Sequence, residues 1–191
     1  MFTLKDFRNT FKDCPEKSLN SLLALASEVS LKKNEIIAKT GEICKNAYIV
    51  KQGIIRSFHT DDKGKEYTRS LFTAGKTTGS LGSLISGQPS RLTYECLTDC
   101  VVYKFNFKDF KELAKKDSNI LKLYSQILEN IFFLLETRIE ELAFLNATEL
   151  YLKLKKEIPG IETLIPQYHI ASYLNVSAVQ LSRIRKEIYS K

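Results

Sequence analysis

The stretch from residue 118 to residue 145 constrains the fold most strongly, because it contains neither glycine nor proline and carries two apolar stripes at helical spacing. One stripe consists of Ile120, Tyr124, Ile127, Ile131 and Leu134, and the other of Leu121, Leu128, Phe132, Leu135, Ile139 and Leu142. As an α-helix the stretch would be roughly 42 Å long. One stripe would bury this helix against its own domain, and the second stripe requires another partner.

The simplest partner for the second stripe is the same helix of a second copy of the chain. The alternative is a helix buried within one monomer, but so short a chain offers little else that would cover the second face. We therefore expect a parallel homodimer. The predicted dimer contacts are Tyr124, Ile127, Leu128, Ile131, Phe132, Leu135, Ile139 and Leu142.

A different periodicity precedes this helix. Between residues 28 and 106, short β-branched or aromatic segments alternate with turns that contain glycine. The predicted strands cover residues 35–38, 47–51, 54–60, 66–72, 92–97 and 101–105. Strands that recur roughly every 8 to 12 residues are typical of an antiparallel roll or barrel. We expect a helix over residues 5–27 before them, so that residues 1–117 would form a sensor domain.

Residues 165–189 predict two short helices joined by a tight turn. Each helix has one apolar edge, formed by Ile170, Ala171 and Leu174 in the first and by Leu181, Ile184 and Ile188 in the second. Asn175 lies at the turn, where a residue that tolerates positive φ is needed, and Ser177 is placed to cap the second helix. The opposite face of the second helix carries Gln180, Arg183, Lys186 and Glu187. Such a helix fits a DNA major groove, and the alternative is a hairpin with a solvated basic face.

The charge and composition narrow the function classes. The 191-residue chain has a formal net charge of +7, which favours polyanionic partners. Acidic residues stand where a signal peptide would be apolar, and no apolar run suits a membrane span, so we expect a cytoplasmic protein without a membrane contact. The four cysteines are too far apart for a metal site, and His59 is the only histidine of the predicted roll. We therefore expect no enzyme activity, no metal and no cofactor.

Residues 170–186 fit the pattern IAxxLxVSxxxLSRIRK and resemble the helix-turn-helix of the Crp/Fnr family of bacterial transcription regulators. The segment GSLGSLISGQPSR at residues 79–91 occupies the place of the family's phosphate cassette, and LAFL at residues 142–145 resembles the end of its dimerisation helix. The resemblance implies an α+β fold in three parts. These are an N-terminal antiparallel β-roll, which is a double-stranded β-helix of the cyclic-nucleotide-binding type, a dimerisation helix at 118–145 and a helix-turn-helix DNA-binding domain at 146–191.

The resemblance also implies a function. It predicts a homodimeric transcription regulator that binds an inverted repeat in double-stranded DNA, with RNA polymerase as a further partner. The residues expected to contact DNA are Ser177, Ala178, Val179, Gln180, Arg183 and Lys186. Arg183 is assigned to guanine and Gln180 to adenine or a phosphate. The chain ends at Lys191, where many relatives continue into a β-hairpin wing, so we expect further backbone contacts from elsewhere. The chief alternative is a ligand-binding module whose helical tail docks another protein.

The cassette departs from the family pattern where cyclic AMP would be held. Ser80 and Ser90 replace an acidic residue and an arginine of the family, and Arg91 comes one position too late. The predicted effector pocket comprises Gly79, Ser80, Leu81, Gly82, Ser90, Arg91 and Leu135. Leu135 stands where the dimerisation helix of cyclic-AMP binders offers a hydroxyl group. We expect no response to cyclic AMP, although Arg91 and the backbone amides of residues 79–82 would suit another small anion as an unidentified effector.

Overall fold

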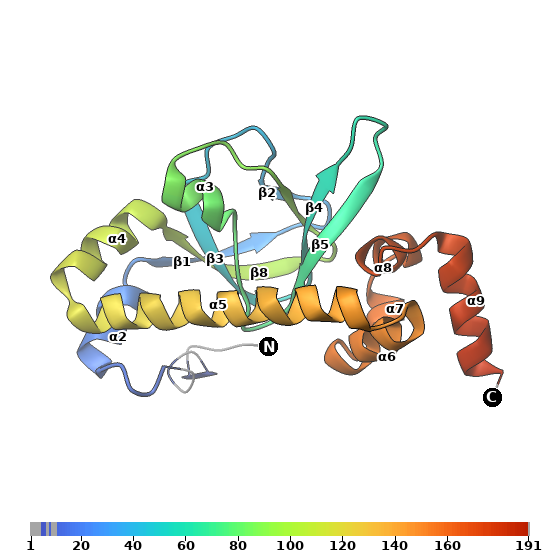
Figure 1. Ribbon diagram of the computed structural model, residues 1–191. Helices are drawn as coiled ribbons and strands as arrows, with labels where there is room; N and C mark the ends of the chain where they lie inside the picture. Colours follow the sequence, from blue (N-terminus) through green and yellow to red (C-terminus); the bar gives the residue numbers. More distant parts are fainter. Residues whose placement is uncertain (1–4, 7, 9–10, 191) are drawn as a thin grey trace.

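The computed structural model describes residues 5–6, 8 and 11–190, and Figure 1 shows a β-roll lying beside one long helix, with shorter helices at the far end of that helix. The strands are β1 (Ala26–Leu31), β2 (Ile36–Ala38), β3 (Asn46–Gln52), β4 (Ile55–Thr60), β5 (Glu66–Phe72), β6 (Thr77–Thr78), β7 (Thr93–Cys96) and β8 (Cys100–Asn106). The helices are α2 (Glu16–Leu23), α3 (Leu81–Ser86), α4 (Phe107–Lys116), α5 (Ser118–Phe144), α6 (Ala147–Glu157), α7 (Ile161–Leu164), α8 (Gln167–Tyr173) and α9 (Ala178–Tyr189). The predicted α+β architecture is confirmed.

The roll consists of two four-stranded antiparallel sheets, with the strand orders β1-β8-β3-β6 and β2-β7-β4-β5. Alternate side chains of each strand point into the space between the sheets, because successive residues of a strand face opposite sides. The innermost of these side chains include Val50, Ile55, Cys96 and Val102. Strand β5 lies at the end of its sheet, so one of its edges is available to another element.

The prediction of one helix over residues 5–27 is wrong in its middle, where residues 11–15 are not helical and α2 begins at Glu16, and at its C-terminal end; residues 7, 9 and 10 of that range lie outside the described residues. Helix α2 ends at Leu23, and β1 then pairs with β8 from Ala26 opposite Phe105 to Leu31 opposite Cys100. A local apolar pattern cannot reveal pairing with a strand so distant in sequence, and here the ladder overrides the helical pattern. The sequence interpretation also omitted α3, α4 and β6.

Helix α5 confirms the predicted long helix. The Asp117 carboxylate caps its start by accepting a hydrogen bond of 2.9 Å from the Asn119 backbone N–H. In its first half, Ile120 and Tyr124 are buried in a cluster with aromatic side chains of α4. In its second half the apolar side chains are exposed, with Ile139 at 69% and Phe132 at 60%. The described chain therefore covers the first half of α5, whereas both stripes are largely exposed in the second half, where Leu134 of the first stripe is 53% exposed.

The C-terminal helices share an apolar core with the roll. Helix α5 ends at Phe144, and Asn146 begins α6 with a capping box that also involves Glu149. The core between these helices and the roll includes Leu150, Leu154, Ile161, Ile170 and Leu181 together with Ile54 and Leu97. The domain boundaries at residues 117 and 145 stay predictions. Among the described residues, no helix combines the length and apolar character that a bilayer crossing requires.

His169 is buried where α8 packs against the roll. Its side chain is 5% exposed, and its Nδ1 atom has no hydrogen-bond partner among the described residues. Burial, together with the positive charges of Arg56 and Lys33, lowers the pKa of His169 to about 4. Arg56 is itself held by Glu66 at 2.7 Å and by Glu95 at 2.6 Å. His169 is therefore neutral in the folded protein at neutral pH.

This burial predicts a loss of stability in mild acid. The unfolded chain binds a proton at His169 near the ordinary pKa of 6.5, whereas the folded chain does so only near 4. The contribution of His169 is fully present above pH 6.5 and is lost as the pH falls toward 4, by about 1.4 kcal/mol per pH unit inside that window. Urea unfolding between pH 7 and pH 5 measures it. The variant His169→Phe should lose this part of the pH dependence, and parallel curves for both proteins would contradict the assignment.

Candidate nucleic-acid interface and effector cassette

The turn between α8 and α9 has the predicted geometry. Asn175 adopts a left-handed conformation with φ of 57°, which confirms the assignment of a residue tolerant of positive φ to this position. The chain reverses there because the Val176 backbone N–H donates to the Ala171 carbonyl oxygen at 3.0 Å. The apolar edges of the two helices face the shared core, with Ile170, Ala171, Leu174 and Leu181 buried and Ile184 and Ile188 partly buried. The hairpin therefore presents the opposite face of α9 to solvent.

All the residues predicted to contact DNA lie on exposed positions at the start and along the outer face of α9. They are Ser177, Ala178, Val179, Gln180, Arg183 and Lys186. Val179 is the most prominent apolar group among them, with 61% of its surface exposed. The exposed Ser182 belongs to the same face, because it follows Ala178 by four residues and precedes Lys186 by four. The sequence interpretation missed Ser182, although its helical spacing would have identified it.

The predicted adenine contact of Gln180 competes with a hydrogen bond that its side chain already makes, whereas the alternative phosphate contact stays a prediction. Its Oε1 atom accepts a hydrogen bond of 2.8 Å from the Ser177 backbone N–H, and the Gln180 backbone N–H donates to Ser177 Oγ at 3.2 Å. This reciprocal pair is a capping box that starts α9. Bidentate recognition of adenine would require the amide oxygen as well as the amide nitrogen, so it would break the cap. The observed role of the Gln180 side chain is therefore to cap the start of α9.

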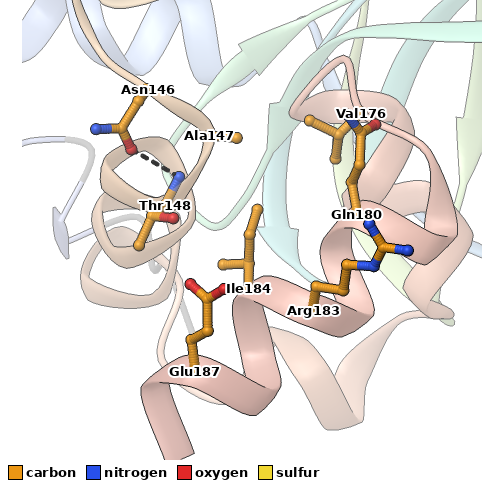
Figure 2. A pocket seen from close by; sticks show the side chains of 8 residues that line it. All are labelled: Asn146, Ala147, Thr148, Val176, Gln180, Arg183, Ile184 and Glu187. Atoms are coloured by element: carbon orange, nitrogen blue, oxygen red, sulfur yellow. Dashed lines mark hydrogen bonds between the residues drawn. The ribbon is translucent and has the colours of Figure 1, made fainter.

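A groove of about 470 Å³ separates the outer flank of α9 from the start of α6. Figure 2 shows side chains from both elements along this groove. Its lining consists of Asn146, Ala147, Thr148, Val176, Gln180, Arg183, Ile184 and Glu187. Two predicted DNA contacts, Gln180 and Arg183, thus share a surface with the first residues of α6. The sequence predicted that the helix continues or restarts between Leu142 and Pro159, and α6 is that restart, but no residue of α6 was among the predicted DNA contacts.

The lower flank of α9 is held by Glu162 of the short helix α7. The Arg185 Nε atom donates to Glu162 at 3.0 Å, and the Tyr189 hydroxyl donates to it at 2.6 Å. Burial alone would raise the pKa of Glu162, but hydrogen bonds from Tyr151, Tyr189 and Lys155 outweigh it and lower the pKa to about 2. The Arg185 side chain is consequently engaged in an intramolecular ion pair with Glu162, and it is not part of the exposed basic face.

The side chains at the two serine positions of the cassette contact each other. The Ser80 and Ser90 hydroxyl groups share a hydrogen bond of 2.8 Å, and the Ser90 hydroxyl also lies 2.6 Å from the Leu92 carbonyl oxygen. Both serines are buried, whereas Arg91 is exposed. Gly79 has φ of 119°, and a Cβ atom there would lie 3.2 Å from the Asn46 carbonyl oxygen. The two serine hydroxyl groups of this segment thus satisfy each other.

The other predicted pocket residues differ in exposure, and their grouping into one pocket stays a prediction. Leu81 is partly buried, Gly82 is exposed, and Leu135 stands 43% exposed on α5. Arg69 of β5 was missed by the sequence interpretation, although its Nη2 atom donates to the Tyr94 hydroxyl at 3.3 Å. That contact depends on pairing between strands that are distant in sequence, so a local sequence pattern cannot predict it. Among the described residues, no group of three or more His, Cys, Asp or Glu side chains is arranged to hold a metal ion.

Comparison with known proteins places these features in context. Residues 28–117 match the cyclic nucleotide-binding domain family. The cAMP-activated global transcriptional regulator CRP of Salmonella typhimurium is 27% identical over 108 residues, which are 56% of this chain and 51% of that protein. The chain thus spans about half the length of the curated relatives that it matches.

Two solved structures have a similar fold. FixK2 from Bradyrhizobium japonicum aligns with a TM-score of 0.74 and 20% identity over 86% of this chain and 85% of its own. The c-di-GMP responsive global regulator CLP of Xanthomonas campestris aligns with a TM-score of 0.66 and 16% identity over 92% of each chain. Both alignments extend past the roll, because each covers more of the chain than residues 28–117.

Proposed function

We propose that this chain, which is of Crp/Fnr type in its cyclic nucleotide-binding domain and in its fold, is a homodimeric transcription regulator that binds specific DNA sequences. The observation that carries the proposal is the face of α9, where Val179, Arg183 and Lys186 are exposed on a helix whose other side is buried. A major groove accepts such a helix and is read by such side chains. RNA polymerase, a small-molecule effector and the cytoplasmic location stay predictions.

The direct test is selection of bound sequences from a pool of random duplex DNA. An inverted repeat with half-sites about one helical turn apart, roughly 34 Å, is the expected outcome. The rival function is a ligand-binding module whose C-terminal helices dock another protein. Salt separates the two, because binding through several phosphates weakens steeply as the salt concentration rises.

The exposed apolar stripe of α5 supports a dimer. The second half of the helix exposes the apolar side chains of Phe132, Leu135, Ile139 and Leu142. Burial of this apolar surface against a second copy would favour association. Tyr124 is the exception among the predicted dimer contacts. It is buried in its own chain against Phe110, with ring centroids 5.4 Å apart, so we exclude it from the proposed interface.

The dimer proposal predicts the effect of a charge on this stripe. Phe132→Glu or Leu135→Glu is expected to produce monomers, because two like charges would face each other across the two-fold axis of the dimer. Analytical ultracentrifugation measures the mass. Ile85→Glu on α3 is the matched control, since Ile85 is 57% exposed and lies on the roll. A dimer that persists in both stripe variants would place the interface elsewhere.

The DNA proposal predicts different behaviour for two cations of α9. Arg183→Ala is expected to cost about 1–3 kcal/mol on the selected site and to relax the preference at one base pair of each half-site. Lys186→Ala should weaken selected and random sequences alike and reduce the salt slope by about one. Fluorescence anisotropy with both kinds of duplex gives the comparison. Equal losses on selected and random DNA for Arg183→Ala would make Arg183 a phosphate contact.

The mutual pairing of Ser80 and Ser90 predicts weak binding of cyclic AMP. Neither hydroxyl replaces the charged partners that a cyclic nucleotide finds in the family, and each missing charge-assisted contact costs about 1.5–3 kcal/mol. Isothermal titration calorimetry is expected to give a dissociation constant well above the micromolar range. Low-micromolar binding would show that Arg69 or the backbone amides of α3 compensate.

A further inference from the structure

In addition to the shared apolar core, one serine joins helix α8 to the roll by hydrogen bonds. Ser172 lies against β5, at the edge of its sheet. The Thr68 backbone N–H donates to Ser172 Oγ at 2.9 Å, and the Ser172 hydroxyl donates to the Glu66 carbonyl oxygen at 2.8 Å. A single hydroxyl group thus satisfies one donor and one acceptor of the free edge of β5. Such an edge is otherwise satisfied by water or by another strand.

The next residue of α8 is attached to α5. The Arg138 Nη2 atom donates to the Tyr173 carbonyl oxygen at 2.6 Å, and the Arg138 guanidinium lies 4.1 Å from the centre of the Tyr173 ring. The other end of the guanidinium contacts Glu141 at 3.2 Å, and Glu141 also accepts Lys153 of α6 at 2.5 Å. Only 15% of the Arg138 side chain is exposed. Its contacts are therefore little screened by solvent.

These contacts bridge a break in the chain. Helix α5 ends at Phe144, and the backbone is extended at Leu145 and Asn146 before α6 begins. Two extended residues between rigid helices would act as a hinge unless other contacts span them. The Arg138 network spans this break from α5 to α6 and α8, while Ser172 spans from α8 to the roll. Helix α9 is expected to move together with α8, because the two helices share one apolar core. Contacts with Glu162 hold the opposite flank of α9.

We infer that Arg138 and Ser172 are positioning residues that set the orientation of α9 relative to α5, and thereby the distance between the two DNA-reading helices of the dimer. The inference rests on the proposed function. In a dimer joined through α5, a fixed orientation of α9 presents both readers at one separation. This raises the effective concentration of the second reader when the first has bound. Without the contacts, α9 samples many separations, and ordering it on DNA costs conformational entropy.

The test uses the full-length protein and the half-site found by selection. Binding is measured to a single half-site and to inverted repeats in which the spacing varies one base pair at a time. The wild type is expected to prefer one spacing. Ser172→Ala and Arg138→Gln should bind the preferred repeat roughly tenfold more weakly and show a flattened spacing preference, while their affinity for a single half-site stays within about twofold of wild type.

Matched variants separate positioning from general damage. Ser172→Thr keeps a hydroxyl group and is expected to restore the spacing preference. Ser21→Ala removes a hydroxyl that, among the described residues, donates to the Lys17 carbonyl oxygen of its own helix, and Lys122→Gln removes an exposed cation of α5. Both should behave as wild type. Amide hydrogen exchange at Thr68 gives a readout without DNA, and it should be faster in Ser172→Ala.

Three results would overturn the inference. An unchanged spacing preference in both variants would show that other contacts orient α9. A parallel loss on single half-sites would show that the contacts stabilise α9 itself, and a gain in affinity would show that they hold α9 away from its DNA-binding position. If the wild type selects no sequence at all, the proposed function fails and the inference fails with it, whereas faster exchange at Thr68 would still verify the contact.

Discussion

The burial of the first half of α5 against the roll is the interaction on which the rest of the structure depends. Tyr124 packs edge-on against Phe107 and Phe110, and Ile120 is completely buried beside them. An α-helix is stiff over this length, so anchoring one half decides where the other half projects. The uncovered stripe around Phe132 and Ile139 and the start of α6 both have their places because of this anchor.

At the C-terminal end of α5, polar and apolar contacts have different roles. The shared core around Leu150, Ile170 and Leu181 holds the C-terminal helices to the roll, but apolar contact is not directional. The hydrogen bonds of Ser172 and Arg138 have defined donors and acceptors, so they select one orientation among those that the core would tolerate. Stability and orientation are thus supplied by separate sets of residues.

Residues 79–91 combine a constrained backbone with two serine side chains that pair with each other. Gly79 keeps the positive φ and the close approach to Asn46 that the backbone shape requires. Ser80 and Ser90, which belong to the predicted pocket, hydrogen-bond to each other through their hydroxyl groups. Buried polar groups need partners, and Ser80 and Ser90 find them within the protein. The hydrogen-bonding groups of these two serines are therefore paired without a ligand.

The sequence by itself determined the features that depend on neighbouring residues. These include the long helix, most strands of the roll, the turn at Asn175 and the cap at Ser177, because periodicity, φ preference and capping act over a few residues. Only the tertiary structure decided the pairing of β1, the burial of Tyr124 within its own chain and the contacts of Arg69 and Ser172. Each of these joins segments far apart in the chain, and the side chains on both sides must be placed before the contact exists. Local pattern carries no information about that placement.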